Sequence, residues 1–141
     1  MASKVVITFI ILGALLFTNC SDDDTSTTPV EQESIQGSWN LKKVSGGLMG
    51  TSIDYDKGLV EWSFDTTTNR LTIINTILTT GTEDIYAGLD SGTYDYEIRL
   101  EENTITLFVN DTKQGALILS ESALKIDNDI ATDGLIKEFE R

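Results

Sequence analysis

The chain has 141 residues, one cysteine, one proline and no histidine, and its 23 acidic residues against ten basic ones give a net charge of −13. So large an excess of negative charge excludes binding to nucleic acid or to an anionic lipid face through a basic patch. One cysteine cannot form a disulfide within the chain, and the lack of histidine removes the commonest general base and the usual zinc ligands. We therefore expect a protein that is not an enzyme and has no cofactor or metal.

The first 19 residues have the pattern of a signal peptide. Lys4 precedes an apolar run from Val5 to Phe17 that is interrupted only by Thr8. A helix of that length rises about 20 Å, which is short of the roughly 30 Å hydrocarbon core of a bilayer. The pattern therefore favours a cleaved signal over a transmembrane anchor.

The residues around the only cysteine resemble a sorting signal. Leu16-Phe17-Thr18-Asn19-Cys20 is similar to a bacterial lipobox, which implies cleavage before Cys20 and acylation of its thiol. Each buried methylene contributes about 0.8 kcal/mol, so two or three acyl chains anchor a protein stably.

An acidic run follows the cysteine at once. Ser21-Asp22-Asp23-Asp24 resembles the export signal that sends some Gram-negative lipoproteins to the cell surface. The alternative is a solvated linker, because such a composition cannot bury a core. We expect a lipid-anchored protein of the outer membrane, at the cell surface of a Gram-negative bacterium.

These segments divide the chain into a signal peptide (1–19), a flexible acidic tether (20–33) and a folded domain (34–141) of 108 residues. A domain of that size is long enough for one modest core. Because Lys4 lies in the signal, the mature chain keeps nine basic residues against all 23 acidic ones, a net charge of −14.

In the domain, apolar and polar residues alternate with period two, and turn residues separate the runs. Eight strands are predicted, at 35–44, 59–64, 70–78, 93–100, 104–109, 114–119, 122–127 and 135–141. No stretch beyond the signal has a helical period. Sequential strands with tight turns are typical of an up-and-down barrel or a sandwich, and a barrel leaves no exposed edge. We expect an all-β, eight-stranded antiparallel up-and-down barrel.

Short motifs at the two ends of the domain favour the barrel. Gly37-Ser38-Trp39 lies on the first predicted strand, and Phe139-Glu140-Arg141 ends the last. In these motifs the chain resembles the lipocalin-like (calycin) superfamily, and more closely the short lipocalin-like lipoproteins of Gram-negative bacteria. The resemblance implies that Arg141 stacks on the Trp39 ring and helps to close the barrel, a contact worth about 0.5–2 kcal/mol.

The resemblance extends to two turns and also has departures. The first strand runs into the Gly-rich loop Val44-Ser45-Gly46-Gly47, and Asp133-Gly134 precedes the last strand, as in those lipoproteins. Thr93-Tyr94-Asp95-Tyr96 has a different order from the Thr-Asp-Tyr motif of the superfamily, and no C-terminal helix follows the barrel.

Two further motifs are explained without chemistry. Ser122-Ala123-Leu124-Lys125 matches a Ser-x-x-Lys pattern, but in a strand residues three apart point to opposite faces. Asp127-Asn128-Asp129, with Asp133 and Glu138, has the acidic spacing of a calcium loop but lacks its glycine. An acidic hairpin turn is the favoured interpretation.

Two long loops, 45–58 and 79–92, set apolar residues between glycines. Such loops suit a lid over a barrel mouth, with Leu48 and Met49 as lid residues, or a plug that completes the core. Apolarity selects these candidates for a ligand-binding wall: Val60, Trp62, Phe64, Tyr94 and Tyr96.

Two functions follow as hypotheses. In the first, the barrel binds a small apolar or amphipathic molecule. In the second, the barrel is filled, and the protein acts through its exterior as an accessory component of the cell envelope. The sequence indicates no particular protein partner.

Overall fold

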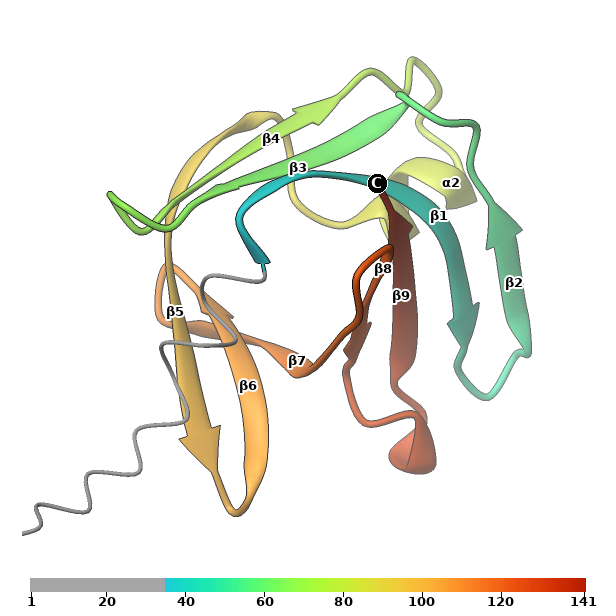
Figure 1. Cartoon of the computed structure of the whole chain (residues 1–141). Coiled ribbons are helices and arrows are strands. Elements are labelled where there is room, and N and C mark those ends of the chain that lie inside the picture. The colour runs from blue at the N-terminus through green and yellow to red at the C-terminus, as the bar shows by residue number, and fades with distance from the viewer. Residues whose placement is uncertain (1–34) are drawn as a thin grey trace, which may run out of the picture.

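Buried and exposed side chains alternate along the strands, and the antiparallel strands form one sheet that closes on itself (Figure 1). The computed structural model describes residues 35–141, so the signal peptide, Cys20 and the acidic tether lie outside the described residues. The strands are β1 (Gly37–Gly46), β2 (Thr51–Asp54), β3 (Val60–Asp65), β4 (Arg70–Asn75), β5 (Gly92–Glu101), β6 (Thr104–Val109), β7 (Thr112–Leu119), β8 (Ala123–Asp127) and β9 (Leu135–Glu140). A helix, α2 (Thr82–Ala87), and a 3₁₀ turn, η1 (Ile130–Thr132), interrupt the series.

Eight of these strands form the closed barrel. From β3 to β9 each strand pairs with the next one along the chain, and β1 pairs with β3 on one side and with β9 on the other. The closing ladder runs from Asn40 opposite Glu140 to Gly46 opposite Leu135. The predicted eight-stranded antiparallel barrel is confirmed.

The twist of the barrel is supported by its hairpin turns. Glu102 and Asn103 both have positive φ, as do Asn110 and Asp111. Turns with positive φ at both central residues match the right-handed twist of the flanking strands. The predicted turns after residues 100 and 109 therefore lie where the sequence places them.

The Gly-rich loop and the final Asp-Gly turn of the sequence contact each other. Gly47 N donates to Gly134 O at 3.0 Å. A Cβ on Gly46, whose φ is +120°, would lie 2.6 Å from the same oxygen. Only glycine fits so close a backbone approach at this φ.

Two elements depart from the prediction. β2 adds a ninth strand inside the expected 45–58 loop and pairs with the same edge of β1 as β3, with Lys43 opposite Asp54. No helical period marks a helix beyond the signal, yet a short one, α2, lies in the expected 79–92 loop. Six residues are too few to show a helical period or to be stable alone, so α2 depends on tertiary contacts.

β4 is also shorter than the predicted strand 70–78. It ends at Asn75, whose Oδ1 accepts a hydrogen bond from Ile77 N at 3.0 Å, while Asn75 N donates to Ser91 Oγ at 2.8 Å. Side-chain bonds to the backbone replace the ladder at this point.

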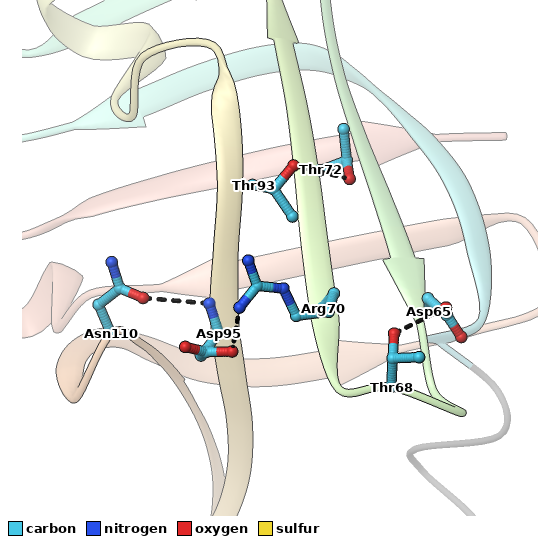
Figure 2. A network of polar contacts seen from close by, with 7 residues as sticks. All are labelled: Asp65, Thr68, Arg70, Thr72, Thr93, Asp95 and Asn110. Carbon is cyan, nitrogen blue, oxygen red and sulfur yellow. Dashed lines mark hydrogen bonds and ion pairs between the residues drawn. The ribbon is translucent and has the colours of Figure 1, made fainter.

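Polar contacts lie on the outer face of the sheet around β5, which pairs first with β4 and, further along its length, with β6 (Figure 2). Arg70 of β4 forms an ion pair with Asp95 of β5, and Asp95 N donates to Asn110 Oδ1 at 3.0 Å. In the β3–β4 turn, Thr68 Oγ1 donates to Asp65 Oδ2 at 2.7 Å. Exposed pairs contribute only about 0–1 kcal/mol each, so the network fixes geometry more than stability.

The core lies inside the barrel. Its largest fully buried side chains include Trp39, Trp62, Phe64, Phe139 and Leu71. Full burial of an aromatic or aliphatic side chain of this size contributes about 1.5–3 kcal/mol.

Among residues 35–141 no helix is both long and apolar enough to cross a membrane.

Candidate ligand-binding interior

The residues predicted to line a ligand site belong to the inner face of β3 and β5. Val60, Trp62, Phe64 and Tyr96 are buried, and Tyr94 is partly buried against the core. Tyr94 differs from the others because its hydroxyl donates to the main-chain oxygen of Asp90 at 2.8 Å.

Their rings pack against one another. Trp62 lies 5.1 Å from Phe139 between ring centroids and 6.2 Å from Phe64. Phe64 in turn meets Tyr96 edge-on at 5.1 Å. Offset and edge-to-face pairs at these distances contribute about 0.5–1.5 kcal/mol beyond the burial itself. This aromatic cluster of Trp62, Phe64, Tyr96 and Phe139 fills one section of the interior.

The two tryptophans lie directly opposite each other on β1 and β3 but differ in their hydrogen bonding. Trp39 Nε1 donates to Ile35 O at 2.8 Å. Trp62 Nε1 is buried and has no hydrogen-bond partner among the described residues. A buried donor left without a partner costs about 1–3 kcal/mol.

The C-terminal residue lies against the first strand. The guanidinium carbon of Arg141 is 4.4 Å from the centre of the Trp39 ring. Lys57 Nζ donates to Arg141 O at 2.7 Å. Together these contacts hold the end of β9 beside the start of β1, where the barrel closes.

Lys137 of β9 faces the interior and was missed by the sequence analysis. The register sets it opposite Val44 of β1 and Ile126 of β8, both of which are core residues. Phe139, two positions further along β9, is also buried in the core. Their neighbours Glu138 and Glu140 point outward and form ion pairs with Lys125 and Lys42.

The ammonium of Lys137 lies next to the end of α2. A Cβ built on Gly88 would be 2.9 Å from Lys137 Nζ. Burial lowers the pKa of Lys137 below its usual value of 10.5. The signal for this residue was present in the sequence, because Leu135, Lys137 and Phe139 alternate on one face; a lysine at such a position is ordinarily assigned to solvent.

The segment 76–91, between β4 and β5, carries α2 over the core. Ala87 is fully buried, and Tyr86 and Leu89 pack partly buried beside it. Tyr55 Oη donates to the main-chain oxygen of Glu83 at 2.9 Å. Burial, with the charges of Glu83 and Asp84, raises the pKa of Tyr55 to about 12.

The predicted lid residues do not share this position. Leu48 and Met49 lie in the turn between β1 and β2 and are 88% and 91% exposed. Leu48 N donates to Asp133 Oδ1, which joins this turn to the one between β8 and β9. The segment that packs over the interior is the one containing α2.

The acidic turn after β8 uses its carboxylates locally. Asp127 Oδ1 accepts from Ile130 N at 2.9 Å, and Asp129 accepts from Thr132 Oγ1. Among residues 35–141 no group of three or more acidic, cysteine or histidine side chains is arranged to hold a metal ion.

A depression of about 760 Å³ lies on the outer surface, where its lining includes Glu101, Thr106, Lys113 and Asp127. Lys113 and Glu101 form an ion pair of 3.0 Å within it, so its principal charges already have partners.

Comparison with family models, with curated proteins and with solved structures finds no match for this chain. The candidate site therefore rests on the geometry of the interior.

Proposed function

We propose that this chain is a membrane-anchored, lipocalin-like lipoprotein whose barrel holds a small amphipathic molecule. One observation carries the proposal: Trp62 Nε1 is buried in the inner wall without a hydrogen-bond partner among the described residues. Lys137, on the same wall, is partly buried, and its Nζ makes no hydrogen bond or ion pair with residues 35–141. Interiors that serve only as structural cores keep such groups hydrogen-bonded. Unpaired groups on the inner face suit atoms supplied by a ligand.

The two groups belong to one stretch of wall. The ring of Trp62 contacts Phe139, and Phe139 is the inward neighbour of Lys137 on β9. Trp62 and Phe139 are 0% and 1% exposed, so a molecule that binds along this stretch must first move these rings apart to reach their faces and the two donors. A largely apolar wall with a few polar groups is typical of small-molecule sites.

The segment containing α2 provides the means of entry. It is held over the core by the Tyr55–Glu83 hydrogen bond and by a few apolar side chains, with Gly81 and Gly88 at the two ends of the helix. Short covers of this kind open without unfolding the sheet.

Binding is tested with the chain from residue 21 onward, which keeps every residue of the barrel. Titration with the neutral fluorescent probe N-phenyl-1-naphthylamine should show one saturable site with Kd near 1 μM, about 8 kcal/mol. Trp62→Ala should weaken binding, whereas Ile118→Ala, at an exposed position of β7, should not. Absence of saturable binding by a chain that unfolds cooperatively would contradict the proposal.

The second candidate is a filled barrel that acts through its exterior as an accessory component of the envelope. The mutual contacts of the aromatic cluster favour it, because those rings already occupy part of the interior. Failure of the probe titration would leave this function in place of the first.

We also propose that Cys20 anchors the protein and that Ser21, Asp22, Asp23 and Asp24 direct it to the cell surface. All five residues lie outside the described part of the chain, so the support is the motif alone. Changing the three aspartates to alanine should keep the lipid but shield the protein from protease added to intact cells. Equal protease sensitivity would reduce the run to a linker.

A further inference from the structure

β2 has a hydrogen-bonded neighbour on one side only. It is the end member of the sheet and pairs with β1 alone, whereas the eight strands of the barrel have neighbours on both sides (Figure 1). An unpaired strand edge presents N–H and C=O groups that can pair with a further strand. Among the described strands, β2 is therefore the one with a fully open side.

The hydrogen bonds to β1 show which groups of β2 face this open side. Tyr55 N donates to Lys42 O at 2.9 Å, so Tyr55 faces β1, and every second residue before it does the same. Backbone groups point to the two sides of a strand at alternate residues, so the N–H and C=O groups of Ser52 and Asp54 point away from β1. Within residues 35–141 these four groups make no hydrogen bond.

A groove of about 560 Å³ lies along the open side of β2. One wall consists of Ser52, Ile53 and Asp54, and the other of Thr79, Gly81, Thr82 and Glu83 from the segment that contains α2. Consecutive strand residues point to opposite faces, so a groove that all three share lies along the edge of the strand and not on either face. The groove is therefore the space that a pairing strand would occupy.

The charges around the groove favour a basic segment. The charged residues of its lining are Asp54, whose side chain is 80% exposed, and Glu83, and no lining residue is basic. Lys43 pairs with Asp54 at 3.6 Å, whereas Glu83 makes no ion pair within residues 35–141. Leu78, which directly precedes the groove residue Thr79, is 98% exposed and adds apolar surface. Complementary charge selects partners and rejects those of like charge.

The same charges disfavour pairing with another part of this protein. Two β2 edges joined in a dimer would bring the acidic walls of both copies together, and like charges placed opposite each other destabilise a sheet. The tether 20–33 contains five acidic residues and no basic one, so it is repelled as well.

We propose that the open edge of β2 binds an extended segment of a partner protein, one that alternates basic and apolar residues and adds a strand to the sheet. Backbone hydrogen bonds to Ser52 and Asp54 hold this segment, as in other complexes formed by strand addition. Its basic side chains lie next to Asp54 and Glu83, and its apolar side chains cover Leu78. The interaction uses the exterior of the barrel and does not depend on a ligand in the interior.

The test uses the peptide acetyl-Lys-Val-Lys-Val-Lys-Val-amide and the ¹⁵N-labelled chain from residue 21 onward. Titration followed by NMR should show saturable binding with a Kd below about 1 mM. Amide hydrogen exchange is the sharper measurement, because saturating peptide should slow exchange at Ser52 and Asp54 by at least about fivefold. The N–H of Ile53 already faces β1, so it is the internal control and should change little.

Variants separate backbone pairing from charge. Ser52→Pro removes an outward N–H, which an edge strand can lose without unfolding, and should weaken binding by about tenfold or more. Glu83→Gln should weaken binding by about two- to fivefold. Its matched control is Glu121→Gln, in the exposed turn between β7 and β8, which should leave the affinity unchanged. The acidic peptide acetyl-Glu-Val-Glu-Val-Glu-Val-amide should not bind.

Three results would overturn the proposal: no saturable binding of the basic peptide, equal binding of the acidic peptide, or bound peptide that leaves exchange at Ser52 and Asp54 as fast as before. Slow exchange at these two residues in a chain that dimerises without peptide would also overturn it, since the edge would then pair with a second copy. None of these results bears on the probe titration of the interior, so this proposal and the proposed function can fail separately.

Discussion

Lys137 packs against Gly88: the Nζ of the lysine lies 2.9 Å from the position that a Cβ on residue 88 would occupy. Gly88 has a φ of +101° and follows the last residue of α2. The cation of β9 and the segment over the core are therefore in contact. Whatever binds Lys137 must also meet the end of α2.

Lys137→Met should stabilise the unliganded protein, by about 1 kcal/mol near neutral pH, because it removes donors that have no partner. A polar side chain whose removal stabilises the protein is typical of a functional position. Urea unfolding of the two proteins measures the difference, with Lys125→Met as the control. Destabilisation by Lys137→Met would show that the ammonium is already satisfied in the unliganded barrel.

The same comparison has a pH dependence. Since burial lowers the folded-state pKa of Lys137, the unfolded chain binds more protons between that pKa and 10.5. The free energy of unfolding of the wild type therefore rises with pH in this window. The advantage of Lys137→Met should be full below the folded-state pKa and should disappear as the pH approaches 10.5.

Tyr55→Phe should destabilise the protein by about 0.5–1.5 kcal/mol, because the variant loses the hydrogen bond to Glu83 O that holds α2. The pKa of Tyr55 is raised to about 12, so its contribution is complete below pH 10 and is lost as the pH rises toward 12. The difference from wild type should narrow over that range.

Tyr86→Phe is the matched control for this measurement. Tyr86 also packs beside the core from α2, but its hydroxyl makes no hydrogen bond within residues 35–141. Equal effects of the two substitutions would show that the Tyr55–Glu83 bond does not hold the segment.

Arg141→Gln should lower the free energy of unfolding by about 0.5–2 kcal/mol through loss of the cation over the Trp39 ring. Fluorescence of Trp39 should change as well, because the charge next to its ring is removed. A variant with the stability and spectrum of the wild type would remove this contact from the account of barrel closure.

Cys20→Ala should leave an unprocessed precursor that incorporates no fatty acid, because the acylated thiol is absent. Metabolic labelling with a fatty acid, followed by a mobility comparison, measures both properties. If label still enters the variant, the anchor has been assigned to the wrong residue.

The barrel could be predicted because nearly every strand alternates cleanly, as in β3, where Val60, Trp62 and Phe64 are buried between partly exposed residues. β2 and α2 could not be predicted. They have four and six residues, too few to show a hydrophobic period, and both depend on contacts with distant strands. The lining residues of β3 and β5 were chosen from apolarity, and the same criterion passed over Lys137. The alternation of Leu135, Lys137 and Phe139 sets Lys137 on one face of the strand, and the register of β9 against β1 and β8 shows that this face is the inner one.

The most direct test of binding inside the barrel uses the two indole N–H groups of the described chain as reporters in one molecule. Trp39 Nε1 is already bonded to Ile35 O, whereas Trp62 Nε1 has no partner among residues 35–141. In ¹⁵N-resolved NMR spectra, stepwise addition of N-phenyl-1-naphthylamine should move the Trp62 indole resonance to saturation and leave that of Trp39 nearly unchanged. A Trp62 resonance that stays in place throughout the titration would contradict a ligand in the interior.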